Sequence, residues 1–105
     1  MLMVIKKDGT FEPFDRNKLM RGIFNAIKKR PVNIERVNKI AEDVENHFAN
    51  AMISQTTSEE IGNMTLELLK DVDDVAYIRF ASVYKAFTSV EGFITAISEL
   101  DRKHK

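Results

Sequence analysis

The sequence contains no cysteine, no tryptophan, only two prolines and only four glycines among its 105 residues. Without cysteine the chain cannot form a disulfide, a thiolate metal site or a cysteine nucleophile. Its two histidines, His47 and His104, are too far apart in sequence to match the usual spacing of metal ligands. No apolar run approaches the roughly 18 residues that a membrane-spanning helix needs, and no signal-peptide layout is present. We therefore expect a cytoplasmic protein with no membrane partner and no metal site.

The short motifs of phosphate binding and catalysis are also missing. The glycines, at positions 9, 22, 62 and 92, form neither G-x-x-x-x-G-K-[ST] nor G-x-G-x-x-G. G-x-S-x-G and H-E-x-x-H are absent too, and no Ser/His/Asp order stands out. The sequence therefore predicts no catalytic residue and a protein that is not an enzyme.

The charge is balanced overall but unevenly distributed along the chain. Residues 1–30 contain eight basic and three acidic residues, whereas residues 31–75 contain three basic and ten acidic ones. The basic excess of the first third favours an anionic partner. The alternative is that these charges only coat solvated helix faces. The composition, 44% hydrophobic and 30% charged, is that of a folded globular domain.

The sequence pattern predicts a single α+β domain. Residues 2–7 and 10–14 alternate as strands around the turn formed by Asp8 and Gly9, and residues 51–55 form a short link that can supply a third strand. Helices are predicted over 16–29, 34–49, 58–70, 74–87 and 90–100, with Asp15, Asn33, Thr57, Asp73 and Ser89 as N-caps. A short β-hairpin or three-stranded sheet should thus pack on a bundle of four to five helices, in a domain of residues 1–100 followed by a charged tail, 101–105.

Apolar spacing also predicts which side chains face the interior. In the helix over 58–70 these are Ile61, Met64, Thr65 and Leu68, and Thr57 with Glu60 forms a capping box. The helix over 74–87 is apolar on most sides, so it should lie at the centre of the core or in an interface. Tyr77, Phe80 and Phe87 should pack in the core, which leaves Tyr84 as the aromatic candidate for a ligand.

A cluster of lysines surrounds the predicted start of the first helix. Lys6 and Lys7 lie at the end of one strand, and Lys18 lies in the first helical turn. A helix N-terminus presents unpaired N–H groups and a partial positive charge, so with these lysines it could hold a triphosphate. Val4 and Leu19 could contact the base. The alternative is a plain hairpin whose lysines are solvated.

The run V-I-K-K-D-G-T-F-E-P-F-D-R-N-K-L, at residues 4–19, resembles the opening of the ATP-cone domain. That domain binds ATP or dATP at the N-terminus of many ribonucleotide reductases, and it forms the C-terminal part of the ribonucleotide-reductase repressor family, NrdR. The segments K-R-P-V, at 29–32, and V-A-Y-I-R-F-A-S-V-Y-K-A-F, at 75–87, resemble the repressor version. The resemblance extends over about residues 2–100.

The resemblance implies a nucleotide site. Lys6, Lys7 and Lys18 would hold phosphates, while Glu12 and Asp15 would contact the sugar or base or order the lysines. Either carboxylate could distinguish ATP from dATP. The full set of implied nucleotide-binding residues is Val4, Lys6, Lys7, Glu12, Asp15, Lys18, Leu19, Ser58, Gly62, Tyr84 and Lys85.

The resemblance also implies partners. These are adenine nucleotides, with Mg²⁺ able to arrive with them, and further copies of the chain, whose association the nucleotide would control. In the repressor family a zinc ribbon with four cysteine ligands precedes the cone. Because this chain has no cysteine, we expect zinc and operator binding to belong to that missing part, and the chain to be a truncated form or a natural stand-alone cone.

Three other functions compete with this prediction. One is an oligomerisation module that ignores nucleotide. Another is a DNA-binding domain that uses the basic residues of the first third, which the acidic middle of the chain disfavours. The last is the regulatory cone of a ribonucleotide reductase, which the repressor-like segment at 75–87 disfavours.

Overall fold

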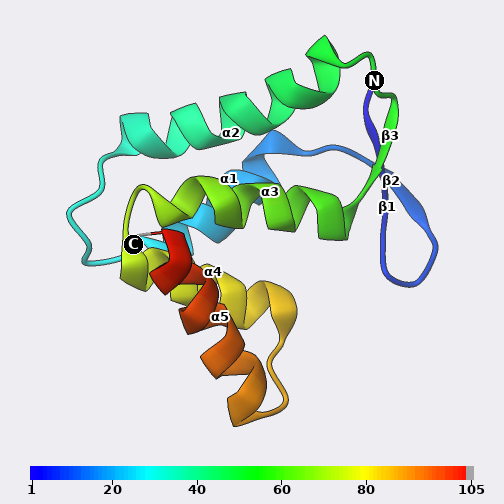
Figure 1. Ribbon diagram of the computed structural model, residues 1–105. Helices are drawn as coiled ribbons and strands as arrows, with labels where there is room; N and C mark the ends of the chain where they lie inside the picture. The colour runs from blue at the N-terminus through cyan, green and yellow to red at the C-terminus, as the bar shows by residue number, and fades with distance from the viewer. Residues whose placement is uncertain (104–105) are drawn as a thin grey trace.

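The structure is a computed structural model that describes residues 1–103. Its strands are β1 Met3–Ile5, β2 Phe11–Pro13 and β3 Gln55–Thr57. Its helices are α1 Arg16–Ala26, α2 Ile34–Asn50, α3 Ser58–Lys70, α4 Asp74–Lys85 and α5 Val90–Lys103. The small sheet stands at one end of the helices, and α2 and α5 lie on opposite sides of α3 (Figure 1). The predicted α+β fold is confirmed.

The sheet has β1 in its centre, with β2 antiparallel on one side and β3 parallel on the other. A tight turn joins β1 to β2, in which Gly9 has a φ of 86° and the Asp8 carboxylate accepts hydrogen bonds from the Thr10 N–H (3.0 Å) and hydroxyl (2.6 Å). This turn already begins at Lys6, whose carbonyl accepts from the Gly9 N–H (2.9 Å). The two strands are therefore shorter than predicted, and Lys6 and Lys7 lie outside β1.

The helix starts match the predicted N-caps. Four of the capping side chains accept hydrogen bonds from first-turn amides, those of Asp15, Asn33, Thr57 and Asp73. Ser89 accepts likewise from Gly92 (3.3 Å). The capping box of α3 is half formed, because the Glu60 carboxylate accepts from the Thr56 hydroxyl (2.6 Å) instead of returning to the cap.

Two helices end earlier than predicted. α1 stops at Ala26 rather than at residue 29, and α4 stops at Lys85 rather than at residue 87. A residue in the left-handed region follows each end, Lys29 at φ 60° and Ala86 at φ 48°. Such residues reverse the chain at helix ends, and a non-glycine residue there carries no sequence signal of the kind that glycine gives.

The core lies between α1, α2, α3 and α4, where Ile23, Val37 and Leu69 are fully buried. On α3 the buried leucines are Leu66 and Leu69, whereas the predicted Met64 and Leu68 are only half-buried. The reason is that α3 is covered from two sides, by α2 and by α4, so its buried face is wider than one stripe. A second cluster ties the sheet to α2 and α3 through Val4, Val44, Phe48 and Ile61.

Ionic contacts fasten α1 to α4 at their neighbouring ends. The Arg30 guanidinium donates to both carboxylate oxygens of Asp73, at 2.8 and 2.9 Å, while Asp73 also caps α4 through the Ala76 N–H (2.9 Å). From α4, Arg79 donates to the carbonyls of Ala26 (3.3 Å) and Lys28 (2.7 Å), which satisfies acceptors left open at the end of α1. These contacts hold two helices that are distant in sequence at a set separation.

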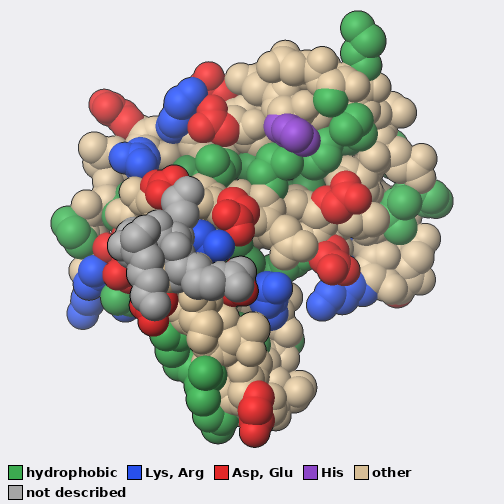
Figure 2. Space-filling view, viewed as in Figure 1, with side chains coloured by type: hydrophobic (Ala, Val, Ile, Leu, Met, Phe, Trp, Pro, Cys, Tyr) green, Lys and Arg blue, Asp and Glu red, His purple; other side chains and the backbone are tan. Residues whose placement is uncertain are grey.

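The last helix, α5, packs on the body through Ala96 and Leu100 and leaves an apolar stripe exposed. Figure 2 shows hydrophobic side chains gathered along one side of this helix, and Val90, Ile94 and Ile97 are exposed there. The last helix is longer than predicted, because α5 continues past residue 100 to Lys103; His104 and Lys105 of the predicted tail lie outside the described residues. Within residues 1–103, no helix has both the length and the apolar character to cross a bilayer.

Replacing Asp73 by alanine should lower the free energy of unfolding by about 1–2 kcal/mol, because α4 loses its N-cap and Arg30 loses its partner. Urea unfolding at pH 7 measures this change. Glu42→Gln removes a carboxylate from the exposed face of α2 and is the control, for which we expect no measurable change.

The same contact predicts a pH dependence. The hydrogen bonds from Arg30 hold the pKa of the Asp73 carboxyl below its ordinary value. The stabilisation is therefore present above about pH 4, the ordinary pKa of an unfolded aspartate, and is lost as the pH falls through the lowered native value. The destabilisation caused by Asp73→Asn should accordingly shrink below pH 4; a difference that stays constant down to acid unfolding would contradict this account.

Candidate ligand-binding site

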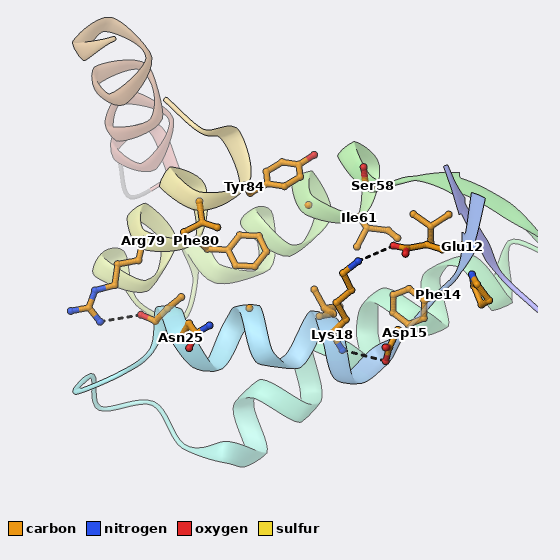
Figure 3. A pocket seen from close by; sticks show the side chains of 17 residues that line it. Glu12, Phe14, Asp15, Lys18, Asn25, Ser58, Ile61, Arg79, Phe80 and Tyr84 are labelled. Atoms are coloured by element: carbon orange, nitrogen blue, oxygen red, sulfur yellow. Dashed lines mark hydrogen bonds and ion pairs between the residues drawn. The ribbon is translucent and has the colours of Figure 1, made fainter. Parts of the chain in front are cut away.

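A cavity of about 360 Å³ opens between α1, α3 and α4, with the β-hairpin at one end (Figure 3). Small-molecule sites begin at roughly this size and combine an apolar wall with a few polar groups. The lining residues are Val4, Glu12, Pro13, Phe14, Asp15, Lys18, Leu19, Gly22, Asn25, Ala26, Ser58, Ile61, Gly62, Arg79, Phe80, Val83 and Tyr84.

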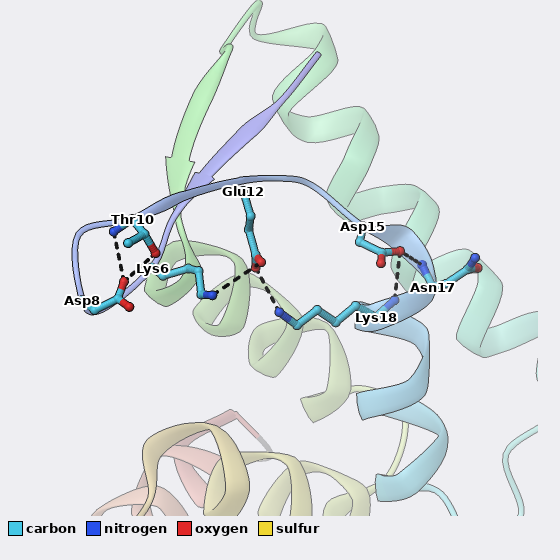
Figure 4. Close-up of polar contacts among 7 residues, drawn as sticks. All are labelled: Lys6, Asp8, Thr10, Glu12, Asp15, Asn17 and Lys18. Atoms are coloured by element: carbon cyan, nitrogen blue, oxygen red, sulfur yellow. Dashed lines mark hydrogen bonds and ion pairs between the residues drawn. The ribbon is translucent and has the colours of Figure 1, made fainter.

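The hairpin end of the cavity is charged. Glu12, on β2, accepts a hydrogen bond from Lys18 Nζ at 3.0 Å and pairs with Lys6 Nζ at 3.8 Å (Figure 4). The hydrogen bond from Lys18 lowers the pKa of the Glu12 carboxyl from its ordinary value. Two ammonium groups thus converge on one carboxylate, and this end retains one net positive charge from the three groups.

Asp15 occupies the N-terminus of α1. One of its carboxylate oxygens accepts from the backbone N–H groups of Asn17 (3.0 Å) and Lys18 (3.3 Å). The expectation that these amides are open to an anion is therefore wrong in part, because the cap already uses them and brings its own negative charge. An anion at this end would rest on the lysine side chains, and Asp15 would present its other oxygen to a neutral hydroxyl.

The opposite wall is aromatic and depends on a glycine. Tyr84 lies across α3 at Gly62, where an added Cβ would come within 2.1 Å of the ring. Its hydroxyl donates to the Glu59 carbonyl, and its ring stacks on Phe80 with centroids 6.2 Å apart and an interplanar angle of 25°. Burial, with a smaller contribution from the Glu59 carboxylate, raises the pKa of Tyr84 to about 12.

The structure brings most of the predicted site residues together. Eight of them line the cavity: Val4, Glu12, Asp15, Lys18, Leu19, Ser58, Gly62 and Tyr84. Lys6 reaches it through Glu12. Lys7 and Lys85 are exposed and do not line it, so the geometry gives them no place in the site as it stands.

Sequence reasoning missed half of the lining. The apolar side chains Phe14, Ile61, Phe80 and Val83 look like ordinary core residues in a sequence; Phe80 was expected in the core and also lines the cavity. Three missed residues carried a signal that helical spacing could have revealed: Gly22, Asn25 and Ala26 follow Lys18 at i+4, i+7 and i+8 on α1. No local pattern indicates that Arg79 lines the cavity, because its position depends on the contact between α1 and α4.

The α+β fold is consistent with that of an ATP cone, and a family model described as "ATP cone domain" matches residues 2–90. Similar curated proteins share the name "Transcriptional repressor NrdR". The one from Caldicellulosiruptor bescii is 48% identical over 99 residues, 94% of this chain and 65% of the relative. The one from Dictyoglomus thermophilum is 48% identical over 102 residues, 97% of this chain and 68% of the relative. The chain therefore belongs to the ATP cone family, within the NrdR group, and it spans about two thirds of the length of these relatives.

The position of Tyr84 predicts an unusual alkaline titration. In a Tyr77→Phe variant the remaining tyrosine should be only about one-tenth ionised at pH 11, whereas a tyrosine of ordinary pKa would be about nine-tenths ionised. Absorbance of the tyrosinate measures the fraction, with far-ultraviolet circular dichroism confirming the fold at that pH. Adding Gly62→Ala should displace the ring and raise the ionised fraction; two variants with the same titration curve would show that the ring does not depend on Gly62.

Proposed function

We propose that this chain binds ATP or dATP in the cavity and serves as the nucleotide-sensing part of a transcriptional repressor of ribonucleotide reductase genes. The observation that carries the proposal is the cavity itself, which combines a lysine-rich end with an aromatic wall inside an ATP cone fold. The names of the relatives support the repressor context.

The charged end suits the phosphates. Lys18 and Lys6 point at Glu12, so an incoming phosphate would exchange one carboxylate partner for several phosphate oxygens. Lys7 and Lys85 could join only by side-chain movement, because neither lines the cavity. Mg²⁺ would arrive with the nucleotide, since residues 1–103 contain no group of three or more His, Asp or Glu that could hold a metal ion.

The sugar would lie beside Asp15. Both oxygens of Glu12 face lysines, whereas Asp15 uses one oxygen for the helix cap and keeps the other for a ligand hydroxyl. ATP and dATP differ by one hydroxyl, and a carboxylate that accepts from it favours ATP because the acceptor would otherwise lose its partner. The Phe80–Tyr84 pair offers the flat apolar surface that a purine needs.

The site is suited to binding without turnover. Glu12 and Asp15 are the two carboxylates that line the cavity, and both are engaged, one by lysines and the other by the start of α1. Neither is placed as a free base that could activate water. We therefore propose a regulatory and not an enzymatic role.

The output of binding would be self-association. The exposed apolar stripe of α5 offers a surface for another copy, and α5 follows α4, which carries Tyr84 in the cavity wall. A nucleotide can shift such an equilibrium only by binding one assembly state more tightly than another. The α5 stripe also favours a second candidate, an oligomerisation module that ignores nucleotide.

Isothermal titration with ATP, dATP and GTP tests the proposal. Lys18→Ala should weaken ATP binding about tenfold or more, because one charge-assisted contact to phosphate is lost. Lys28→Ala removes the same charge from an exposed position outside the cavity and should leave the affinity unchanged. A folded sample that binds none of the three nucleotides would leave the oligomerisation module as the better account.

Light scattering with ATP, with dATP and without ligand tests the assembly. We expect the mass to depend on the ligand, and Ile94→Glu to prevent association because it places a charge in the apolar stripe. Thr95→Glu, on the polar side of the same helix, is the control and should associate normally. The same mass under all three conditions would refute nucleotide control.

A further inference from the structure

The walls of the cavity belong to two separate groups of helices. One wall comes from α3 and α4, and hydrogen bonds tie α4 to α3 at both ends. At the start of α4 the Asp73 N–H donates to the Leu69 carbonyl (3.1 Å), and near its end the Tyr84 hydroxyl donates to the Glu59 carbonyl. The other wall is α1, which carries Lys18 at the hairpin end. The width of the cavity is therefore the distance from α1 to the unit that α3 and α4 form.

Two arginines join α1 to α4 at one end of the cavity. Arg79 donates to the carbonyls of Ala26 (3.3 Å) and Lys28 (2.7 Å), on the side of the cavity opposite to the hairpin end (Figure 3). Arg30 makes the stronger connection, because its guanidinium donates to both carboxylate oxygens of Asp73, at 2.8 and 2.9 Å. A bidentate pair of this kind fixes the orientation of its two partners as well as their distance.

The backbone fixes Arg30 relative to α1. The Ile27 N–H donates to the Ile23 carbonyl (3.1 Å), and the Arg30 N–H donates to the Ile27 carbonyl (2.9 Å), so the turn after α1 is tied to the helix. The exposed fractions of the side chains of Arg30 and Asp73 are 34% and 9%, so solvent screens this ion pair less than a pair on the open surface. Arg30 therefore moves with α1, Asp73 moves with α3 and α4, and their contact couples the two walls.

We propose that Arg30 is a positioning residue for the nucleotide and acts through Asp73 on the separation of α1 from α4, an inference that rests on the proposed nucleotide function. Arg30 does not line the cavity, so its effect on a ligand there is indirect. Without the pair, Lys18 on α1 and the Tyr84 ring on α4 are no longer held at one distance. A ligand that contacts both walls must then restore this distance, which costs part of its binding free energy.

Isothermal titration of ATP to the native chain, Arg30→Lys and Arg30→Gln tests the inference. Asp73 is unchanged in both variants, so the N-cap of α4 remains, and far-ultraviolet circular dichroism checks that each variant is folded. Arg30→Gln should weaken ATP binding about three- to tenfold, the range expected for a residue that acts through packed contacts. Arg30→Lys keeps the charge without the bidentate geometry, so its affinity should lie between those of the native chain and Arg30→Gln.

A second variant separates positioning from a general loss of stability. Ile40→Val shortens a buried side chain of α2 in the same core and lowers the free energy of unfolding, but Ile40 neither lines the cavity nor joins α1 to α4. Ile40→Val should therefore bind ATP as tightly as the native chain does, at a temperature where all variants are folded.

The outcomes separate this inference from the function on which it rests. An ATP affinity in Arg30→Gln equal to that of the native chain would overturn the positioning role and leave nucleotide binding standing. An equal loss of affinity in Ile40→Val would overturn it as well, since stability alone would then explain the effect. A native chain that binds no nucleotide at all would overturn the proposed function and this inference together.

Discussion

The contact between Arg30 and Asp73 is the one on which the rest of the structure depends. The Asp73 carboxylate caps the N-terminus of α4 and also pairs with Arg30, which lies beyond the end of α1. From α4, Arg79 provides a second connection by donating hydrogen bonds to carbonyls at the end of α1. Because α1 and α4 are opposite walls of the cavity, the distance between these helices also sets the width of the site. The pair Asp73 and Arg30 is therefore as important to the site as the residues that line it, although neither lines it.

The arrangement of charge at the hairpin explains how the proposed phosphate site could be held ready before a ligand binds. Glu12 neutralises part of the charge of Lys6 and Lys18 and holds both ammonium groups at the cavity. Without such a carboxylate, two nearby lysines would repel each other and spread into solvent. Asp15 has a different role, because its carboxylate accepts hydrogen bonds from backbone N–H groups in the first turn of α1. The two acids looked equivalent in the sequence, and only their partners distinguish them.

The cavity also shows why glycines without a loop motif matter. Gly62 makes room for the Tyr84 ring, and Gly22 leaves the Phe80 ring uncovered. Neither glycine belongs to a phosphate-binding loop, and both sit inside helices, where glycine is unfavourable for the helix itself. Their role is to let aromatic rings from α4 approach two other helices. The aromatic surface that we propose for the purine is accessible because neither glycine carries a side chain.

Much of the fold followed from local chemistry. Asp8-Gly9 marks a turn because glycine tolerates a positive φ, and Asp15, Asn33, Thr57 and Asp73 mark helix starts because their side chains satisfy first-turn amides. The helix ends at Ala26 and Lys85 escaped prediction because the reversing residues, Lys29 and Ala86, are not glycine.

The sequence by itself determined the class of this protein, through a run of residues from Val4 to Leu19 that resembles the ATP cone. Eight of the eleven residues that it predicted for a nucleotide site line the cavity, while their binding role stays a prediction. Only the tertiary structure decided the rest. Whether Lys85 or Arg79 faces the cavity, and whether Phe80 also lines it, depends on how α4 is rotated against α1 and α3. That rotation is set by contacts between residues 43 and 53 positions apart, Arg30 with Asp73 and Arg79 with Ala26, which no local pattern encodes.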